Sequence, residues 1–233
     1  MLRLEKVSRV YRTRRGDVKA LDKVSLNVNE GEFVVVRGPS GSGKTTLLLS
    51  IGGMLRPTEG QVIANGSDIY AMSERDRARF RAKNIGFIFQ LFHLVPYLNI
   101  IENVFLPAGV VKNRSRLTDA RELLKRLNLS EREYHKPLEL SAGERQRTAI
   151  ARALFNQPRI ILADEPTGNL DPENADRIFG YLAEYQRSGG TVIVVTHGMA
   201  ADRFADRIIH LGEGRIEESL TPGTRGLRLG ARG

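Results

Sequence analysis

Four stretches of the chain are apolar almost throughout and too short to be typical helices. They cover residues 33–36, 85–89, 160–163 and 191–195. Helical stretches lie between them. Short apolar runs of this kind are typical of parallel strands that are buried on both faces. The pattern therefore predicts an α/β fold with a mostly parallel sheet.

The N-terminal part of the chain follows a different pattern. Residues 2–11 and 20–28 alternate between apolar and polar positions, and turn residues follow at 29–31 and 65–66. Alternation indicates strands with one buried and one exposed face. We therefore expect an antiparallel β layer in this part.

Helical spacing is predicted in two places. One helix should run from Thr45 to Met54, directly after a glycine-rich loop. The second place lies between about 99 and 140, where apolar residues recur at helical spacing: Leu117, Ala120, Leu123, Leu124 and Leu127. These residues are expected in the core. The region predicts a helical subdomain inserted at about 91–155.

Composition narrows the classes of function. The 233 residues contain no cysteine, which excludes disulfides and thiolate metal sites. We expect no membrane-spanning helix, because no run of 18 apolar residues is present. We also expect no secretory signal, because residues 1–6 interleave charged and apolar positions. The formal net charge of +9 permits a nucleic-acid or anionic-membrane partner but is more typical of a solvated surface with surplus arginine.

The C-terminal residues 219–233 differ from the rest of the chain. They hold four glycines, one proline and three arginines, with little apolar content. Such a segment buries too little apolar surface to offset the entropy of ordering. We predict a flexible basic tail outside a domain of residues 1–218.

The loop after the first apolar run carries the pattern G-x-x-x-x-G-K-[ST] without departure. Its residues, with the following threonine, are Gly38, Pro39, Ser40, Gly41, Ser42, Gly43, Lys44, Thr45 and Thr46. Glycines let backbone N–H groups surround phosphate oxygens, and a helix N-terminus favours the same anion. Lys44 can reach the β- and γ-phosphates, and the Thr45 hydroxyl can bind Mg²⁺. The loop predicts an ATP-binding site.

Two adjacent acids follow the third apolar run. Asp164 stands at the carboxyl end of this predicted strand, where it can hold Mg²⁺ near Thr45. Glu165 comes next and is placed to polarise a water for attack on the γ-phosphate. In isolation, two acids here are also compatible with a cap on the turn at Pro166. Beside a phosphate loop they predict a nucleotide hydrolase.

The segment Leu140-Ser141-Ala142-Gly143-Glu144 determines the class of hydrolase. Ser141 and Glu144 have the spacing of a capping box, so a helix should begin here with a good anion receptor at its N-terminus. The segment resembles the signature motif of ABC-type ATPases, L-S-G-G-[QE], with Ala142 in place of the first glycine. The resemblance implies the ABC ATPase fold, a P-loop core with a helical insertion. It also implies that Ser141, Ala142, Gly143 and Glu144 face the γ-phosphate held by a second copy of the chain.

Further residues match the family in the expected order. Gln90 resembles the Q-loop glutamine that links Mg²⁺ and the attacking water to the helical insertion, and His197 resembles the switch histidine at the γ-phosphate. Asp171 resembles the D-loop aspartate that reaches across the dimer, and Tyr11 the aromatic residue that stacks on adenine. A strand-face tyrosine remains the alternative for Tyr11. The resemblance thus implies that Lys44, Gln90, Glu165 and His197 are catalytic, and that Thr45, Gln90 and Asp164 hold Mg²⁺.

The wider resemblance covers residues 2–218 and implies a homodimeric transport ATPase that binds ATP and Mg²⁺. It implies an integral membrane permease as partner, a peripheral position on the cytoplasmic face of the inner membrane and no nucleic-acid partner. Motifs at 86–90, 99–104, 140–147 and 163–171 are together similar to the lipoprotein-release and macrolide-export group. Cell-division ATPases of the FtsE type and importer ATPases share much of this pattern and stay open. A soluble ABC ATPase acting on nucleic acid is a more distant alternative.

Overall fold

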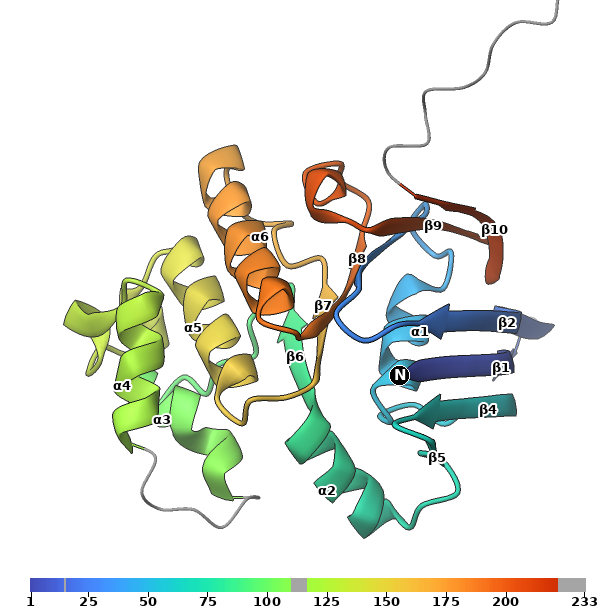
Figure 1. Ribbon diagram of the computed structural model, residues 1–233, viewed down its shortest axis with the longest axis horizontal. Coiled ribbons are helices and arrows are strands. Elements are labelled where there is room, and N and C mark those ends of the chain that lie inside the picture. Colours follow the sequence, from blue (N-terminus) through green and yellow to red (C-terminus); the bar gives the residue numbers. More distant parts are fainter. Residues whose placement is uncertain (15, 110–116, 222–233) are drawn as a thin grey trace, which may run out of the picture.

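The computed structural model describes residues 1–14, 16–109 and 117–221. Its strands form two sheets (Figure 1). The antiparallel sheet has the order β2-β1-β4-β5, and the larger sheet has the order β10-β9-β3-β8-β7-β6. The strands of the antiparallel sheet are β1 (Leu2–Thr13), β2 (Gly16–Val28), β4 (Glu59–Ala64) and β5 (Ser67–Asp68). Those of the larger sheet are β3 (Phe33–Arg37), β6 (Ile85–Phe89), β7 (Ile160–Asp164), β8 (Thr191–Thr196), β9 (Arg207–Gly212) and β10 (Arg215–Leu220).

All neighbours in the larger sheet are parallel except β9 and β10, which form an antiparallel hairpin. The α-helices are α1 (Lys44–Ile51), α2 (Glu74–Asn84), α3 (Ile100–Phe105), α4 (Leu117–Arg126), α5 (Ala142–Leu154) and α6 (Pro172–Arg187). The 3₁₀ helices are η1 (Leu106–Gly109), η2 (Ser130–Arg132), η3 (Pro137–Glu139) and η4 (Asp202–Phe204). None of the helices in the described part of the chain has the length and apolar content needed to cross a bilayer.

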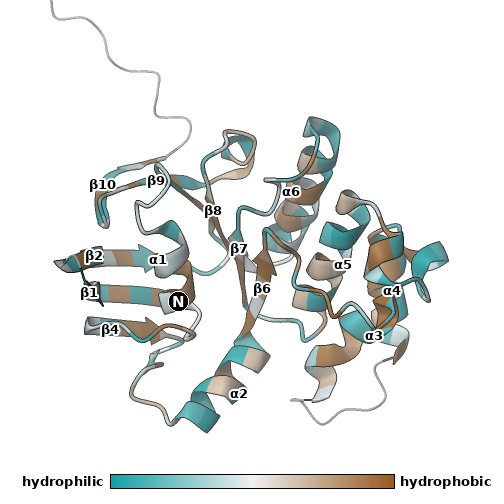
Figure 2. Ribbon diagram, turned by 180° about the vertical axis from the view of Figure 1, so that it is seen from behind, coloured by the Kyte–Doolittle hydropathy of each residue, from teal (hydrophilic) through white to brown (hydrophobic). Residues whose placement is uncertain are grey.

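The central strands divide the core in two because successive side chains point to opposite faces of a sheet. Val34 and Val36 of β3 pack with α1 and the antiparallel sheet. Val35 packs on the other face, in a cluster that contains side chains of α3, α4, α5 and α6. Figure 2 shows this distribution as apolar strands between helices whose outer faces are polar. Helices α1 and α5 therefore lie on opposite faces of the larger sheet.

The predicted fold class is confirmed: a mostly parallel sheet, an antiparallel N-terminal layer and helices between residues 99 and 155. The boundaries 91–155 of a separate helical subdomain stay a prediction. The helix expected at 45–54 ends earlier, at Ile51, because Gly52 and Gly53 follow and Gly53 has a φ of 67°. Leu117, expected in the core, is exposed at the start of α4, whereas Ala120 and Leu124 are buried.

The boundary between domain and tail stays a prediction, but β10 extends two residues into the predicted tail. Ser219 pairs with Ile209 and Leu220 with Ile208, so β10 continues past residue 218. Backbone hydrogen bonds in a sheet hold these residues despite their low apolar content. The remaining residues of the predicted tail, from 222 to 233, lie outside the described residues.

Candidate nucleotide site

The phosphate loop joins the end of β3 to the start of α1. Lys44 is nearly buried, and its Nζ donates to the carbonyl oxygens of Gly38 at 2.7 Å and Pro39 at 2.9 Å. The side chain thus lies across its own loop, with its ammonium group at the helix N-terminus. A ligand with phosphate oxygens can take over these hydrogen bonds.

Glycine is required at two points of this loop because backbone from other elements lies against it. A Cβ at Gly38 would lie 2.1 Å from the Leu211 carbonyl oxygen, and one at Gly43 would lie 2.1 Å from that of Ala20. Gly43 also has a φ of 103°, a left-handed conformation that strains other residues. Within the part of the chain that the structure describes, the buried Ser42 Oγ has no hydrogen-bond partner, so it can donate to a phosphate oxygen.

Asp164 lies beside the phosphate loop. It is the last residue of β7, and its carboxylate accepts a hydrogen bond from the Thr45 side chain. Burial, reinforced by the neighbouring charge of Glu165, raises the pKa of Asp164 even though Thr45 and Lys44 work in the opposite direction. A carboxylate and a hydroxyl in contact are oxygen ligands of the kind that Mg²⁺ prefers. They fit a site in which phosphates and water complete the coordination.

Glu165 directly follows β7 and has a φ of 44°. Its Oε2 accepts from the Thr196 hydroxyl at 2.9 Å, and its Oε1 accepts from the backbone N–H of His197 at 3.0 Å. The His197 ring lies 2.9 Å from the same oxygen through Nδ1. The strained backbone and these contacts place the carboxylate at the carboxyl edge of the sheet, between β7 and β8.

Gln90 reaches the same edge. It follows β6, whose last residue, Phe89, pairs with Asp164. A Cβ at Gly168 would lie 2.8 Å from Gln90 Nε2, so the glutamine side chain lies against the loop that follows Glu165. Four elements that are distant in sequence therefore bring Lys44, Thr45, Gln90, Asp164, Glu165 and His197 to one edge.

The helix predicted at Ser141 begins there, and its capping box is confirmed. The Ser141 hydroxyl accepts from the Glu144 N–H at 3.2 Å, and the Glu144 carboxylate accepts from the Ser141 N–H at 2.8 Å. Burial opposes ionisation of Glu144, but the hydrogen bonds from Ser141 and the ion pair with Arg132 prevail and lower its pKa. Ser141 is exposed, and a Cβ at Gly143 would lie 2.9 Å from Asn174 Oδ1 of α6.

Asp171 caps α6 at the same end of the molecule. Its carboxylate accepts from the Asn174 N–H at 2.9 Å and from the Asn174 side chain at 2.6 Å, and these bonds lower its pKa. Asn174 also lies against Gly143, so the starts of α5 and α6 form one surface. Helix α5 packs on the face of the sheet opposite α1, the helix that follows the phosphate loop.

Tyr11 lies in β1, where it pairs with Val18 of β2. Its ring is partly exposed and is covered by the Arg9 guanidinium, 4.8 Å from the ring centre. Two residues after Val18, the carbonyl of Ala20 lies against Gly43. Tyr11 is therefore on the strand pair that runs past the phosphate loop. This is compatible with stacking on a base and equally with a strand-face tyrosine.

Two residues of this region were not singled out in the sequence. Thr196 binds Glu165, and Arg37, the last residue of β3, donates to the Gly198 carbonyl oxygen at 3.0 Å and pairs with Asp202. Arg37 thus ties the strand before the phosphate loop to the turn after His197. The signal for Thr196 was its place at the end of a buried strand, whereas Arg37 left no signal in the sequence.

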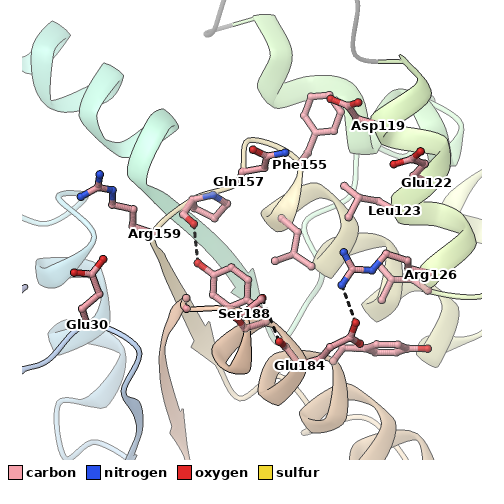
Figure 3. A pocket seen from close by; sticks show the side chains of 17 residues that line it. Glu30, Asp119, Glu122, Leu123, Arg126, Phe155, Gln157, Arg159, Glu184 and Ser188 are labelled. Atoms are coloured by element: carbon pink, nitrogen blue, oxygen red, sulfur yellow. Dashed lines mark hydrogen bonds and ion pairs between the residues drawn. The ribbon is translucent and has the colours of Figure 1, made fainter.

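A cavity of about 420 Å³ lies at the opposite, amino edge of β7 and β8 (Figure 3). It lies between α4, the end of α5 and α6, and contains none of the predicted site residues. The ion pair between Arg126 and Glu184 crosses it at 2.9 Å. The candidate site is therefore the carboxyl edge of the sheet, as is general for open α/β sheets.

Comparison with known proteins agrees with this assignment. The model of the ABC transporter family matches residues 21–168. The lipoprotein-releasing system ATP-binding protein LolD of Hyphomonas neptunium is 44% identical over 220 residues, which are 93% of this chain and 96% of that protein. The uncharacterized ABC transporter ATP-binding protein MJ0796 of Methanocaldococcus jannaschii is 44% identical over 224 residues, 93% of this chain and 95% of that protein. A dimeric structure of MJ0796 in a post-hydrolysis state, bound to ADP and Pi, matches with a TM-score of 0.89 and 41% identity, covering 95% of this chain and 98% of that one.

Proposed function

Because this chain belongs to the ABC transporter family, as a subunit that binds and hydrolyses ATP, we propose that two copies close head to tail around two ATP molecules and thereby energise an integral membrane permease. The observation that carries this proposal is the separation of the two half-sites. Helix α1, which follows the phosphate loop, and helix α5 pack on opposite faces of the sheet, which supports an arrangement in which a second chain brings the two half-sites together. The MJ0796 structure is dimeric, which supports the same arrangement.

Each composite site takes its phosphate-binding part from one chain. Lys44 and the loop from Gly38 to Thr46 bind the phosphates. Thr45, Gln90 and Asp164 would hold Mg²⁺ through their side-chain oxygens. The ion would supply positive charge that stabilises the transferring phosphoryl group. Tyr11 stacks on the adenine ring.

The other chain completes the site. Ser141, Ala142, Gly143 and Glu144 provide a helix N-terminus for the γ-phosphate, and Asp171 contributes from the start of α6. Ala142 adds a methyl group at this contact, in the place of the family's glycine.

Hydrolysis requires a base at the γ-phosphate. Glu165 is the base that accepts the proton of the attacking water. His197 leaves its contact with Glu165 to bind the γ-phosphate. Closure of the dimer excludes bulk water, and charge repulsion between the products reopens it.

The substitution Glu165→Gln tests this function. It should reduce hydrolysis by about 100-fold or more and leave an ATP-bound dimer. In size-exclusion chromatography with light scattering, the variant should elute at twice the 26.0-kDa mass of one chain when ATP is present, and as a monomer without it. The matched control Glu165→Gln/Ser141→Arg should stay monomeric, because the arginine fills the space for the partner's phosphate. Normal turnover by Glu165→Gln would refute the assignment of the base.

For the transported substrate, we propose the lipoprotein-release or macrolide and peptide export type. The relatives include two LolD proteins, from Hyphomonas neptunium and Caulobacter vibrioides, each 44% identical to this chain. The permease partner places the chain at the cytoplasmic face of the inner membrane as a peripheral subunit. Its docking surface is the region 91–106, in which Leu91 is 69% and Tyr97 76% exposed.

Other roles make different predictions. An FtsE-like cell-division ATPase or an importer ATPase would share the same engine and differ in the membrane protein with which it copurifies. Salt-dependent binding of the purified chain to DNA would favour the nucleic-acid alternative. Copurification with a permease that has a large periplasmic domain would favour the export type.

A further inference from the structure

Arg152 of α5 binds the chain segment that follows Gln90. Its Nη1 donates to the carbonyl oxygen of His93 at 2.5 Å, and its Nη2 donates to that of Phe92 at 2.7 Å. Both bonds come from one planar guanidinium group, so they fix the direction of two successive peptide units. Gln90 is only two residues before Phe92.

This arginine has an unusual environment for a cation. Burial lowers its pKa, and no carboxylate in the described part of the chain contributes a compensating shift. Removing a charge from water is costly unless hydrogen bonds replace the water. The carbonyl oxygens of Phe92 and His93 take that role, so the arginine and this segment depend on each other.

The segment itself is strained. Phe92 has a φ of 62° and His93 a φ of 48°, a left-handed conformation that bulky residues rarely adopt. Two successive residues of this kind persist only where surrounding contacts hold them. Besides Arg152, the contacts include Arg145, whose guanidinium lies 5.4 Å from the centre of the Phe92 ring, and Phe89, whose ring meets that of His93 edge-on at 4.9 Å.

Arg145 and Arg152 both belong to the helix that begins at Ser141. The N-terminus of α5 is the part that, in the proposed dimer, contacts the nucleotide of the other chain. The side of α5 that carries Arg152 contacts the segment that follows Gln90, and in the proposed dimer Gln90 lies at the nucleotide of its own chain. One helix therefore contacts the nucleotide site of the other chain at its start and supports the glutamine of its own site further along.

We propose that Arg152 is a positioning residue: it holds residues 91–93 in their strained conformation and so fixes Gln90 relative to the signature helix α5. This inference rests on the proposed composite site. Without Arg152, the segment relaxes and Gln90 loses its defined place, while the phosphate loop keeps its structure.

The substitution Arg152→Gln tests the proposal. Because a misplaced group at a reaction centre costs up to about 100-fold, kcat for ATP should fall at least about 10-fold, while KM for ATP changes less than about 3-fold. Amide hydrogen exchange of residues 91–95 should become faster, while α6 stays protected. As a matched control, Arg126→Gln removes an exposed helix arginine paired with Glu184 and should leave kcat unchanged.

A second substitution separates positioning from packing. Glycine adopts positive φ without strain, so His93→Gly should restore much of the kcat lost in Arg152→Gln. Leu94→Gly, at a neighbouring residue without positive φ, should restore none. If Arg152→Gln does not fold, Arg152→Lys replaces it: it keeps the charge, loses the planar fork, and should show a smaller loss of kcat that His93→Gly reverses.

The outcomes are distinct. Unchanged kcat in a folded Arg152 variant, or equal effects of the glycines at 93 and 94, would overturn the positioning role and leave the proposed dimer intact. Failure of Glu165→Gln to pair with ATP in the otherwise native chain would instead overturn the proposed function itself.

Discussion

The two ends of the candidate site differ in how far one chain completes them. At the carboxyl edge of the sheet, Lys44, Asp164 and Glu165 are each held by several contacts within the chain. At the start of α5, Ser141 and Glu144 satisfy each other's backbone groups and remain at the surface. The first end is therefore arranged within one chain, whereas the second is a capped helix terminus that faces the surface.

This difference implies a division of labour. Nucleotide affinity should depend on the edge of the sheet, because its groups converge within one chain. Turnover and pairing of two chains should depend on the start of α5, because in the proposed dimer it binds the γ-phosphate that the other chain holds. Four substitutions, in order of decreasing effect, can break or sharpen this comparison.

Lys44→Ala should weaken ATP binding and slow ATP hydrolysis. It removes the cation for the phosphates and leaves the carbonyl oxygens of Gly38 and Pro39 at the site. ATP binding by isothermal titration calorimetry should weaken about 10-fold or more, and hydrolysis should fall by about 100-fold or more. Lys125→Ala, at an exposed position of α4, serves as the control and should behave as the native chain. Unaltered ATP affinity in the Lys44 variant would disprove the assignment of the loop.

Ser141→Arg should slow ATP hydrolysis and leave ATP affinity nearly unchanged. The variant should bind ATP with affinity within about 3-fold of the native chain, yet hydrolyse it about 10- to 100-fold more slowly. The reason is that the added side chain occupies the place of the partner's phosphate and touches nothing in its own phosphate loop. Parallel titration and phosphate-release assays measure both quantities. A joint loss of binding and turnover would mean that Ser141 acts within its own chain.

The smallest effects concern stability and have opposite signs at the two ends. Asp164 has a raised pKa, so its ionised form costs free energy in the folded state at pH values above that pKa. Asp164→Asn should therefore raise the midpoint of thermal unfolding of the nucleotide-free chain at pH 7, by roughly 1–4 °C. The gain should disappear as pH falls through the raised pKa toward 3.8.

Glu144 has a lowered pKa, so its ionised form stabilises the fold at pH values above 4.5. Glu144→Gln keeps the capping geometry and loses the ion pair with Arg132, so the midpoint should fall slightly at pH 7, by roughly 1–3 °C. This difference should vanish as pH falls through the lowered pKa. Shifts of the same sign in both variants would contradict the contrast between the two ends.

The sequence predicted those parts of the site that are continuous along the chain. The phosphate loop, the acids after β7 and the helix at Ser141 each consist of a few residues whose order dictates local structure. The contact between Glu165 and His197 spans 32 positions and depends on β7 and β8 being neighbours, which the motif alone does not show. Arg37 and Arg152 donate to backbone carbonyl groups. Every residue has such a group, so no residue type in the sequence indicates these contacts.

Helix α2 shows why part of the fold was not predicted. None of its residues is buried, so it has no apolar stripe for a periodicity argument to find. Ser73 caps its first turn, Phe80 packs against the core in part, and Arg81 Nη1 donates to the carbonyl oxygen of Gly53 at 3.1 Å. The contacts of Phe80 and Arg81 are visible only once the chain has folded.

Three segments meet at the carbonyl of Ala20, against which both Gly43 of the phosphate loop and Gly214 of the β9–β10 turn lie. The Gly214 N–H also donates to the Ser42 carbonyl oxygen at 3.0 Å, and the Asp22 N–H donates to the Gly214 carbonyl oxygen at 2.9 Å. The C-terminal hairpin thus packs against the phosphate loop, although it follows every motif in the chain. A truncation before residue 207 would therefore remove contacts that support the phosphate loop. The same holds for a graft of the cassette that leaves this hairpin out.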